Sequence, residues 1–183
     1  MHVDYWNSFG WKDEFAAPLF TQRQAFYVER LKLDSAYTPQ MVVDGRTEFT
    51  GSDLGKAAKA ITEATKLPKA KIEIVRIDDK LTVKLTDLPD HDVSNIFLAI
   101  AEDNLVSRVA GGENSGKTLE HQSVVRELKS IRLLQRQEKS AEIETILQIN
   151  QNWKKENLKL IVFVQQNESR KIIGVGRIAF EGK

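Results

Sequence analysis

Short alternating segments beyond residue 68 constrain the fold of this 183-residue chain more than any other feature. In KIEIVRIDDKLTVKLTDL, residues 71–88, apolar and polar side chains alternate on both sides of an Asp78-Asp79-Lys80 turn. A period of two is typical of a strand with one buried face. Because such strands are short and evenly spaced, they predict a sandwich of antiparallel sheets. The further strand candidates are residues 95–102, 105–110, 142–149, 158–166 and 171–180.

The first third of the chain mixes helical and strand-like patterns. Residues 21–31, TQRQAFYVERL, predict a helix with a capping box, because Thr21 can accept from the backbone of Gln24 and Gln24 can reach back to the cap. Two short strands around an Asp44-Gly45 turn are predicted next. A second helix, capped by Ser52, places its apolar residues in one stripe formed by Leu54, Ala58, Ile61 and Ala64.

The pattern changes at the segment TKLPKAK, where Leu67-Pro68 is expected to end the second helix. We therefore predict two parts, a mixed α/β part over residues 1–68 and a β-rich, sandwich-like part over residues 69–183. One segment is ambiguous. In residues 121–134 the apolar side chains fit one helical face, yet the β-branched content suits a strand equally well.

Charge and composition narrow the classes of function. Lys and Arg number 27 against 26 Asp and Glu, and the net charge is +1, so no field of one sign favours nucleic acid or an anionic membrane. The chain contains no cysteine, so these residues form no disulfide, no cysteine-based zinc site and no thiol nucleophile. No apolar run reaches the length of a membrane span. We expect no membrane insertion and no bound cofactor.

The segment GGENSGKT, residues 111–118, matches the pattern G-x-x-x-x-G-K-[ST] of a phosphate-binding loop. Such a loop lies between a parallel strand and a helix, whereas the flanking segments here predict antiparallel strands. A nucleotide-binding domain also needs a later strand that ends in Asp, and the best later strand ends in Gln165-Gln166. We therefore predict a glycine-rich connection with Lys117 in solvent, and no bound nucleotide.

The histidines and aromatic residues offer weak signals. His2 and Asp4 share a strand face, but two ligands without a third make no metal site. His91 is expected in solvent. The aromatic-rich loop formed by Trp6, Phe9, Trp11 and Phe15 is expected to pack, or to act as a lid. A polar network that fixes the 111–118 loop is predicted from Glu113, Asn114, His121 and Arg126.

Four longer motifs carry a more specific signal. HVDYWNSFGWKDEF, FTQRQAFYVERL, YTPQMVVDGR and GENSGKTLEHQSVVREL occur in this order over most of the chain. In this respect the chain resembles a bacterial family of unknown function, domain of unknown function 1223. The family is predicted to be secreted and to pair a thioredoxin-like domain with a β-rich C-terminal part.

The resemblance implies a site at YTPQMVVDG, where a helix returns to a strand. It implies that Pro39 is a cis proline and that Thr38 offers its backbone to an extended substrate. In the family, a signal peptide, a first strand and a helix with a C-x-x-C-type motif precede HVDYW. By this comparison the chain is expected to be an N-terminally truncated form, which lacks the first strand and helix of the thioredoxin-like unit.

The resemblance thus implies a secreted or periplasmic thioredoxin-like protein, with thiol–disulfide or other redox-linked activity in a full-length form. These residues contain no redox cysteine and no catalytic constellation such as a nucleophile elbow. The alternative is a non-enzymatic binding module, in which Thr38 and Pro39 hold an extended peptide or a protein partner. Nucleotide binding through residues 111–118 ranks last.

Overall fold

The computed structural model describes residues 1–112 and 114–181. The first part of the chain contains a short 3-10 helix, η1, two α-helices and one β-hairpin; all later elements except a second 3-10 helix, η2, are strands. Their bounds are η1 Tyr5–Ser8, α1 Pro18–Leu31, β1 Gln40–Val43, β2 Thr47–Thr50, α2 Leu54–Thr65, β3 Lys71–Ile77, β4 Lys80–Thr86, β5 Ser94–Glu102, β6 Leu105–Arg108, β7 Thr118–His121, β8 Val124–Leu134, β9 Ala141–Ile146, η2 Lys155–Asn157, β10 Leu158–Gln166 and β11 Ile172–Ala179.

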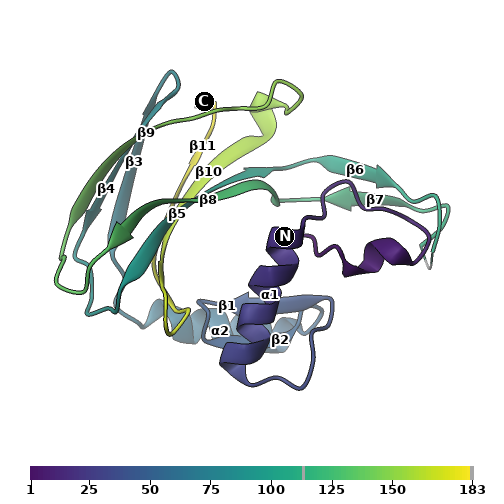
Figure 1. Ribbon diagram of the computed structural model, residues 1–183, viewed down its shortest axis with the longest axis horizontal. Helices are drawn as coiled ribbons and strands as arrows, with labels where there is room; N and C mark the ends of the chain where they lie inside the picture. Colours follow the sequence, from purple (N-terminus) through teal and green to yellow (C-terminus); the bar gives the residue numbers. More distant parts are fainter. Residues whose placement is uncertain (113, 182–183) are drawn as a thin grey trace.

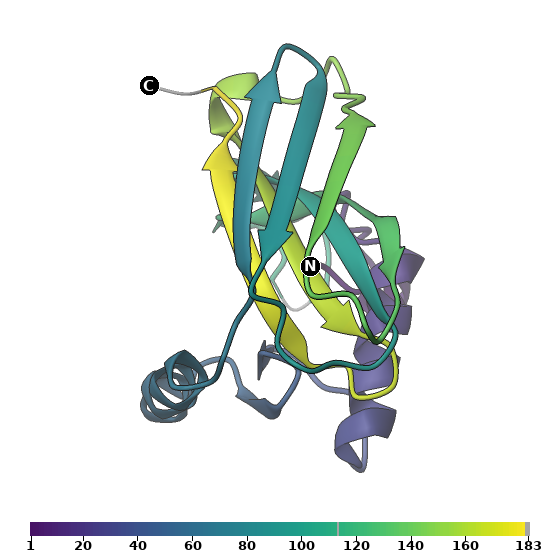
Figure 2. The same ribbon diagram turned by 90° about the vertical axis from the view of Figure 1, so that its left-hand side faces the viewer.

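Two antiparallel sheets form the sandwich that the alternating pattern predicts. One has the strand order β11-β10-β5-β8 and the other the order β3-β4-β9, and Figures 1 and 2 show them facing each other. Their inward side chains make one apolar core, because alternate residues of each strand point to the same face. Its fully buried members include Leu81, Val83, Leu85, Ile96, Leu98, Leu160 and Val162.

Within the described part of the chain, the two sheets approach each other most closely where β3 meets β11. Ala70, just before β3, forms a parallel bridge with Gly174 of β11, and its N–H donates to the carbonyl of Ile173 at 2.7 Å. A Cβ atom on Gly174 would lie 2.9 Å from the side chain of Ala70, so this approach requires glycine. On the other side the sandwich ends in two edge strands, β8 and β9.

The ambiguous segment 121–134 is strand. Residues 124–134 form β8, which pairs with β5 from Val124 to Leu134 with two register shifts. A helix there would leave this edge of β5 unpaired and buried, which is costly for backbone groups.

Helix α1 begins at Pro18, so the predicted capping box at Thr21 is wrong. Proline suits the first helical position because its missing N–H would have no partner there. The hydroxyl of Thr21 instead donates to the carboxylate of Asp4, which fixes the N-terminal segment to the helix. Helix α2 is capped by Asp53, which accepts from the backbone of Lys56 at 2.9 Å, and not by Ser52.

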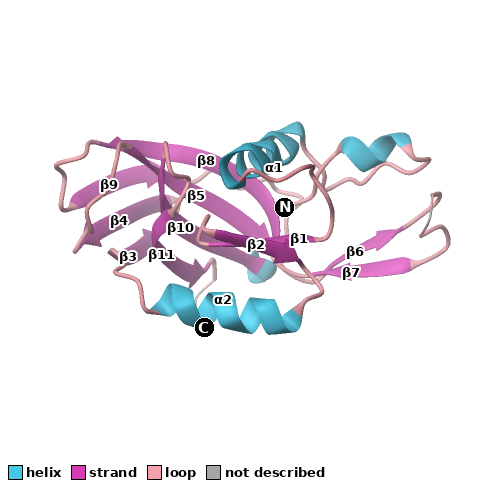
Figure 3. Ribbon diagram, turned by 90° about the horizontal axis from the view of Figure 1, so that it is seen from below, coloured by secondary structure: helices cyan, strands magenta, loops and turns pink. Residues whose placement is uncertain are grey.

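Helix α1 packs across the outer face of the four-stranded sheet, and the hairpin β1–β2 and α2 lie beside it (Figures 1 and 3). The guanidinium of Arg23 lies 5.5 Å and 5.4 Å from the ring centres of Phe97 and Phe163, which stack on each other at 5.2 Å. The Tyr27 hydroxyl accepts from the Gln165 amide at 2.7 Å. The boundary at residue 68 stays a prediction, since α1 contacts the β-rich part directly.

The apolar stripe of α2 faces solvent, with Leu54 81% and Ile61 53% exposed, while Ala57 is the residue that the helix buries. The sequence-based expectation that His91 lies in solvent is wrong. His91 is buried, and its ring nitrogens lie 2.7 Å and 3.0 Å from the carbonyl oxygens of Asp92 and Glu138. Among the described residues, neither α-helix combines the length and the apolar character that crossing a bilayer requires.

Candidate functional site

The GGENSGKT segment connects β6 and β7, which pair as an antiparallel hairpin. The Val109 N–H donates to the carbonyl of Lys117 at 3.0 Å, and the Lys117 ammonium donates to the side chain of Asn114 at 2.9 Å. The strand β7 follows Lys117 directly, where a phosphate-binding loop would begin a helix. A Cβ atom on Gly111 would lie 2.3 Å from the carbonyl oxygen of Gly10, so the close approach of the N-terminal loop accounts for this glycine.

Of the network predicted from Glu113, Asn114, His121 and Arg126, the described members lie in two separate places. Asn114 bonds to Lys117 within the loop, whereas His121 lies at the far end of β7, where its Nε2 is 3.0 Å from the Ser107 hydroxyl. His121 and Arg126 both contact the ring of Phe15, at 5.5 Å and 5.0 Å. Glu113 lies outside the described residues.

His2 pairs with Asp13 and not with Asp4, at 2.5 Å from Nδ1 to the carboxylate. Its ring also lies 5.1 Å from that of His121. Burial lowers the pKa of His121, and the like charge of His2 lowers it further. Burial acts to raise the pKa of Asp13, but hydrogen bonds from His2 and from the Phe15 backbone lower it on balance. Over residues 1–112 and 114–181, no three His, Asp or Glu residues are placed to hold a metal ion.

The Thr38–Pro39 peptide bond is cis, and both residues are exposed in the turn that leads into β1. The Trp6 indole N–H donates to the Thr38 hydroxyl at 3.1 Å. The carbonyl of Tyr37 accepts from the Gln24 amide of α1 at 2.8 Å, and the carbonyl of Pro39 accepts from the backbone of Gly51 at 2.7 Å. Helix α1 and the end of strand β2 therefore hold this turn from two sides.

A network of polar side chains lies next to the Thr38–Pro39 turn. The Gln24 amide also donates to the side chain of Gln40 at 3.0 Å, and Gln40 donates to the Glu48 carboxylate at 3.1 Å. The Tyr37 hydroxyl donates to the same carboxylate. Burial raises the pKa of Tyr37, and the hydrogen bond and charge of Glu48 raise it further, so the phenol stays a donor. The sequence offered no local signal for this network, because its members come from three elements.

Strand β1 has an open edge. The β1–β2 sheet has two strands, and in the antiparallel register Met41 lies opposite Phe49. Along such a pair, every second residue of a strand turns its backbone N–H and C=O groups toward the partner strand. The carbonyl of Pro39 accepts from the N–H of Gly51, so Pro39, Met41 and Val43 are the residues whose backbone groups face β2. The backbone groups of Gln40 and Val42 therefore face away from β2, along an edge that no other described strand pairs with.

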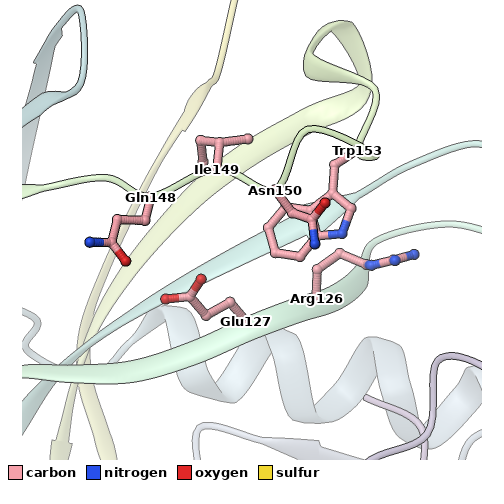
Figure 4. A pocket seen from close by; sticks show the side chains of 6 residues that line it. All are labelled: Arg126, Glu127, Gln148, Ile149, Asn150 and Trp153. Atoms are coloured by element: carbon pink, nitrogen blue, oxygen red, sulfur yellow. The ribbon is translucent and has the colours of Figure 1, made fainter.

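A separate, concave site lies on the open side of the sandwich (Figure 4). It is a hollow of about 390 Å³ between β8 and the segment that follows β9. We call it the β8 hollow; it is lined by Arg126, Glu127, Gln148, Ile149, Asn150 and Trp153. Of these, the sequence singled out Arg126 alone, and for another role, because the lining residues come from segments far apart in the chain and form no motif.

The fold and these sites define a class, an antiparallel β-sandwich that carries a helix–hairpin–helix segment, residues 18–65, with an open strand edge. The chain belongs to the family described as protein of unknown function (DUF1223), whose model matches residues 1–165. None of the curated proteins matches this sequence.

Two solved structures are similar. The crystal structure of a protein from Agrobacterium tumefaciens aligns with a TM-score of 0.76 and 18% identity, over 100% of this chain and 79% of that chain. HBP35 of Porphyromonas gingivalis aligns with a TM-score of 0.55 and 14% identity, over 88% of this chain and 58% of that chain. At these identities the likeness concerns the fold.

Proposed function

We propose that this protein is a thioredoxin-like binding module, which holds an extended segment of a partner polypeptide along β1, beginning at Thr38 and Pro39. The open edge of β1 carries this proposal, because the outward backbone groups of Gln40 and Val42 can pair with an added strand. The order helix, hairpin, helix over residues 18–65 supports the thioredoxin-like assignment.

The surroundings of β1 favour an apolar partner segment. Helix α2, which packs on the β1–β2 hairpin, turns Leu54 and Ile61 to solvent. Trp6, whose indole N–H donates to Thr38, and Phe9, which lies against Trp6, are 50% and 65% exposed. Exposed apolar side chains on elements that contact the β1 strand and its turn favour an apolar partner there. The partner segment would therefore be rich in Val, Ile and similar apolar residues.

The test is a Val42→Pro variant, which deletes one outward N–H of β1 and leaves the bonds to β2 in place. Proline is tolerated on the free side of an edge strand. A fluorescein-labelled decapeptide of alternating valine and threonine, flanked by lysines, is titrated while its anisotropy is followed. We expect the wild type to bind it and Val42→Pro to bind about tenfold more weakly, the scale of one lost hydrogen bond with added steric cost.

The matched control is Thr50→Pro, which removes an outward N–H from the opposite edge of the same hairpin. It should bind the peptide as the wild type does. In a parallel hydrogen-exchange measurement, the bound peptide should slow exchange in residues 40–43. Equal weakening in both variants, or no binding by the wild type, would sink the proposal.

A secreted or periplasmic location and thiol–disulfide activity rest on the family resemblance, and we propose them on that basis only. These 183 residues supply no thiol, so such chemistry needs a cysteine from another polypeptide or segment. The open edge of β1 would then position the substrate of that cysteine. Cell fractionation with an antibody against this chain tests the location, and an insulin-reduction assay on the native protein isolated from its source cells together with its bound polypeptides tests the activity.

A further inference from the structure

The β8 hollow lies away from the β1 edge, between the free edge of the four-stranded sheet and the segment after β9 (Figure 4). Its volume is in the range of sites for small molecules, which lies at roughly 300–1,000 Å³. Its lining combines one aromatic and one aliphatic side chain, Trp153 and Ile149, with four polar ones. This mixture is typical of a site that orients a polar ligand against an apolar surface.

Arg126 is held in place by its surroundings. Its guanidinium lies over two rings, 5.0 Å from the centre of Phe15 and 5.5 Å from that of Trp153. One Nη atom lies 3.5 Å from the Glu102 carboxylate, and among the described residues its N–H groups make no hydrogen bond to protein. Guanidinium donors that are fixed but unused can serve a ligand at the mouth of the hollow.

Glu102 is the buried anchor of this arrangement. Its side chain is 3% exposed, one oxygen accepts from the backbone of Lys154 at 3.1 Å, and Oε2 has no hydrogen-bond partner among the described residues. A buried carboxylate without a full set of donors is costly. A ligand that draws in a bridging water, or that brings Arg126 closer to Glu102, would satisfy this oxygen.

The charges of the hollow are already compensated in pairs. Arg126 lies beside Glu102, and Glu127 has Lys129 at 3.5 Å. An ion of either sign would therefore gain little Coulomb energy there and would meet a like charge close by. Gln148 and Asn150 add neutral amides, which both donate and accept. The lining as a whole suits ligand groups that can both donate and accept hydrogen bonds, as hydroxyl groups do.

We propose that the β8 hollow binds a neutral, hydroxyl-rich ligand, a sugar ring, whose apolar face lies against Trp153. Its hydroxyls accept from Arg126 and donate to Glu127, and the amide of Gln148 orients the ring. This site is independent of the β1 edge, since the two share no residue.

Isothermal titration calorimetry with glucose, galactose, mannose and N-acetylglucosamine tests the proposal, and acetate, phosphate and lysine serve as charged probes. We expect at least one sugar to bind with a Kd of about 1 mM, as suits an open site with few contacts. Glu127→Ala and Gln148→Ala should each weaken that binding about tenfold. The control Glu142→Ala, an exposed carboxylate on β9 outside the hollow, should leave it unchanged.

Far-UV circular dichroism shows whether each variant keeps the wild-type fold, and two separate variants keep the test valid if one of them unfolds. If no sugar released or absorbed heat on binding at about 20 mM, the proposal would be overturned, because a Kd well above about 20 mM does not indicate a specific site. Tighter binding of a charged probe, or sugar binding that is equal in all variants, would overturn it as well.

Discussion

Burial lowers the pKa of His121 below its usual 6.5, and the neighbouring His2 lowers it further, while Asp13 and Glu14 act in the opposite direction. The folded protein therefore resists a proton that the unfolded chain accepts. The stabilisation is fully present above pH 6.5 and is lost as the pH falls below that value toward the folded-state pKa. The pKa of Asp13 is also lowered, and its contribution to stability is lost only as the pH falls below its usual value of 3.8.

We predict that the melting temperature falls between pH 7.5 and pH 5, and that His121→Gln makes this fall shallower because it removes the titrating group. Glutamine can keep a hydrogen bond to Ser107, so the β6–β7 hairpin should stay intact. Thermal melts of both proteins across this range check the prediction. Curves of identical slope would show that His121 does not contribute to the acid sensitivity.

At the scale of elements, the turn of the β1–β2 hairpin is pressed against the β10–β11 turn. Gly45 has φ +65°, and a Cβ atom there would lie 2.0 Å from the carbonyl oxygen of Arg170. The carbonyl of Asp44 accepts from the backbone of Ile172 at 2.9 Å, and Lys69 pairs with the Asp44 side chain. The hairpin that follows Thr38 and Pro39 is thus fixed to the sandwich through its turn.

Gly45→Ala is predicted to destabilise the protein by more than about 3 kcal/mol, because it adds a backbone clash to the cost of positive φ. Gly116→Ala provides the matched control. Gly116 also has positive φ, +79°, but apart from Gly116 itself and its two chain neighbours no described atom lies within 4 Å of the point that a Cβ atom would occupy there. Gly116→Ala should lower the free energy of unfolding by about 1 kcal/mol, which is the cost of placing alanine at positive φ without a clash. Urea unfolding measures both, and equal losses would contradict the docking of the turn.

The sequence predicted the positions of helices and strands better than it predicted which side chains are buried or in contact. Strands with period-two patterning, such as β3 and β4, lie where the pattern places them, since alternation depends on local burial alone. The apolar stripe of α2 was visible in the sequence, but its exposure was not, because exposure depends on which other elements cover the helix. Burial of His91 and the meeting of Arg126 with Trp153 depend on contacts between distant segments, for which no local pattern exists.

At the scale of the whole molecule, α1 adds a second link between the first part of the chain and the sandwich, beside the link through the β1–β2 turn. The helix buries Phe20 and Tyr27, and Arg23 covers the stacked Phe97 and Phe163 on the outer face of the sheet. Burial lowers the pKa of Arg23, yet its guanidinium keeps the aromatic faces as partners. Removing the helix–hairpin–helix segment would uncover this aromatic face, so the two parts of the chain are expected to unfold together.

A Trp153→Phe variant tests that expectation, because its remaining tryptophans, Trp6 and Trp11, both lie in the first part of the chain. Its fluorescence then reports on the N-terminal part, while far-UV circular dichroism is dominated by the strands of the sandwich. We predict that the two thermal transitions coincide, which is the mark of a single cooperative unit. In Arg23→Ala, loss of the contact with Phe97 and Phe163 should lower both transitions equally. If fluorescence changed at a lower temperature than dichroism in the first variant, the N-terminal loop and its contact with the Thr38 turn would melt before the sandwich, which would contradict a single cooperative unit.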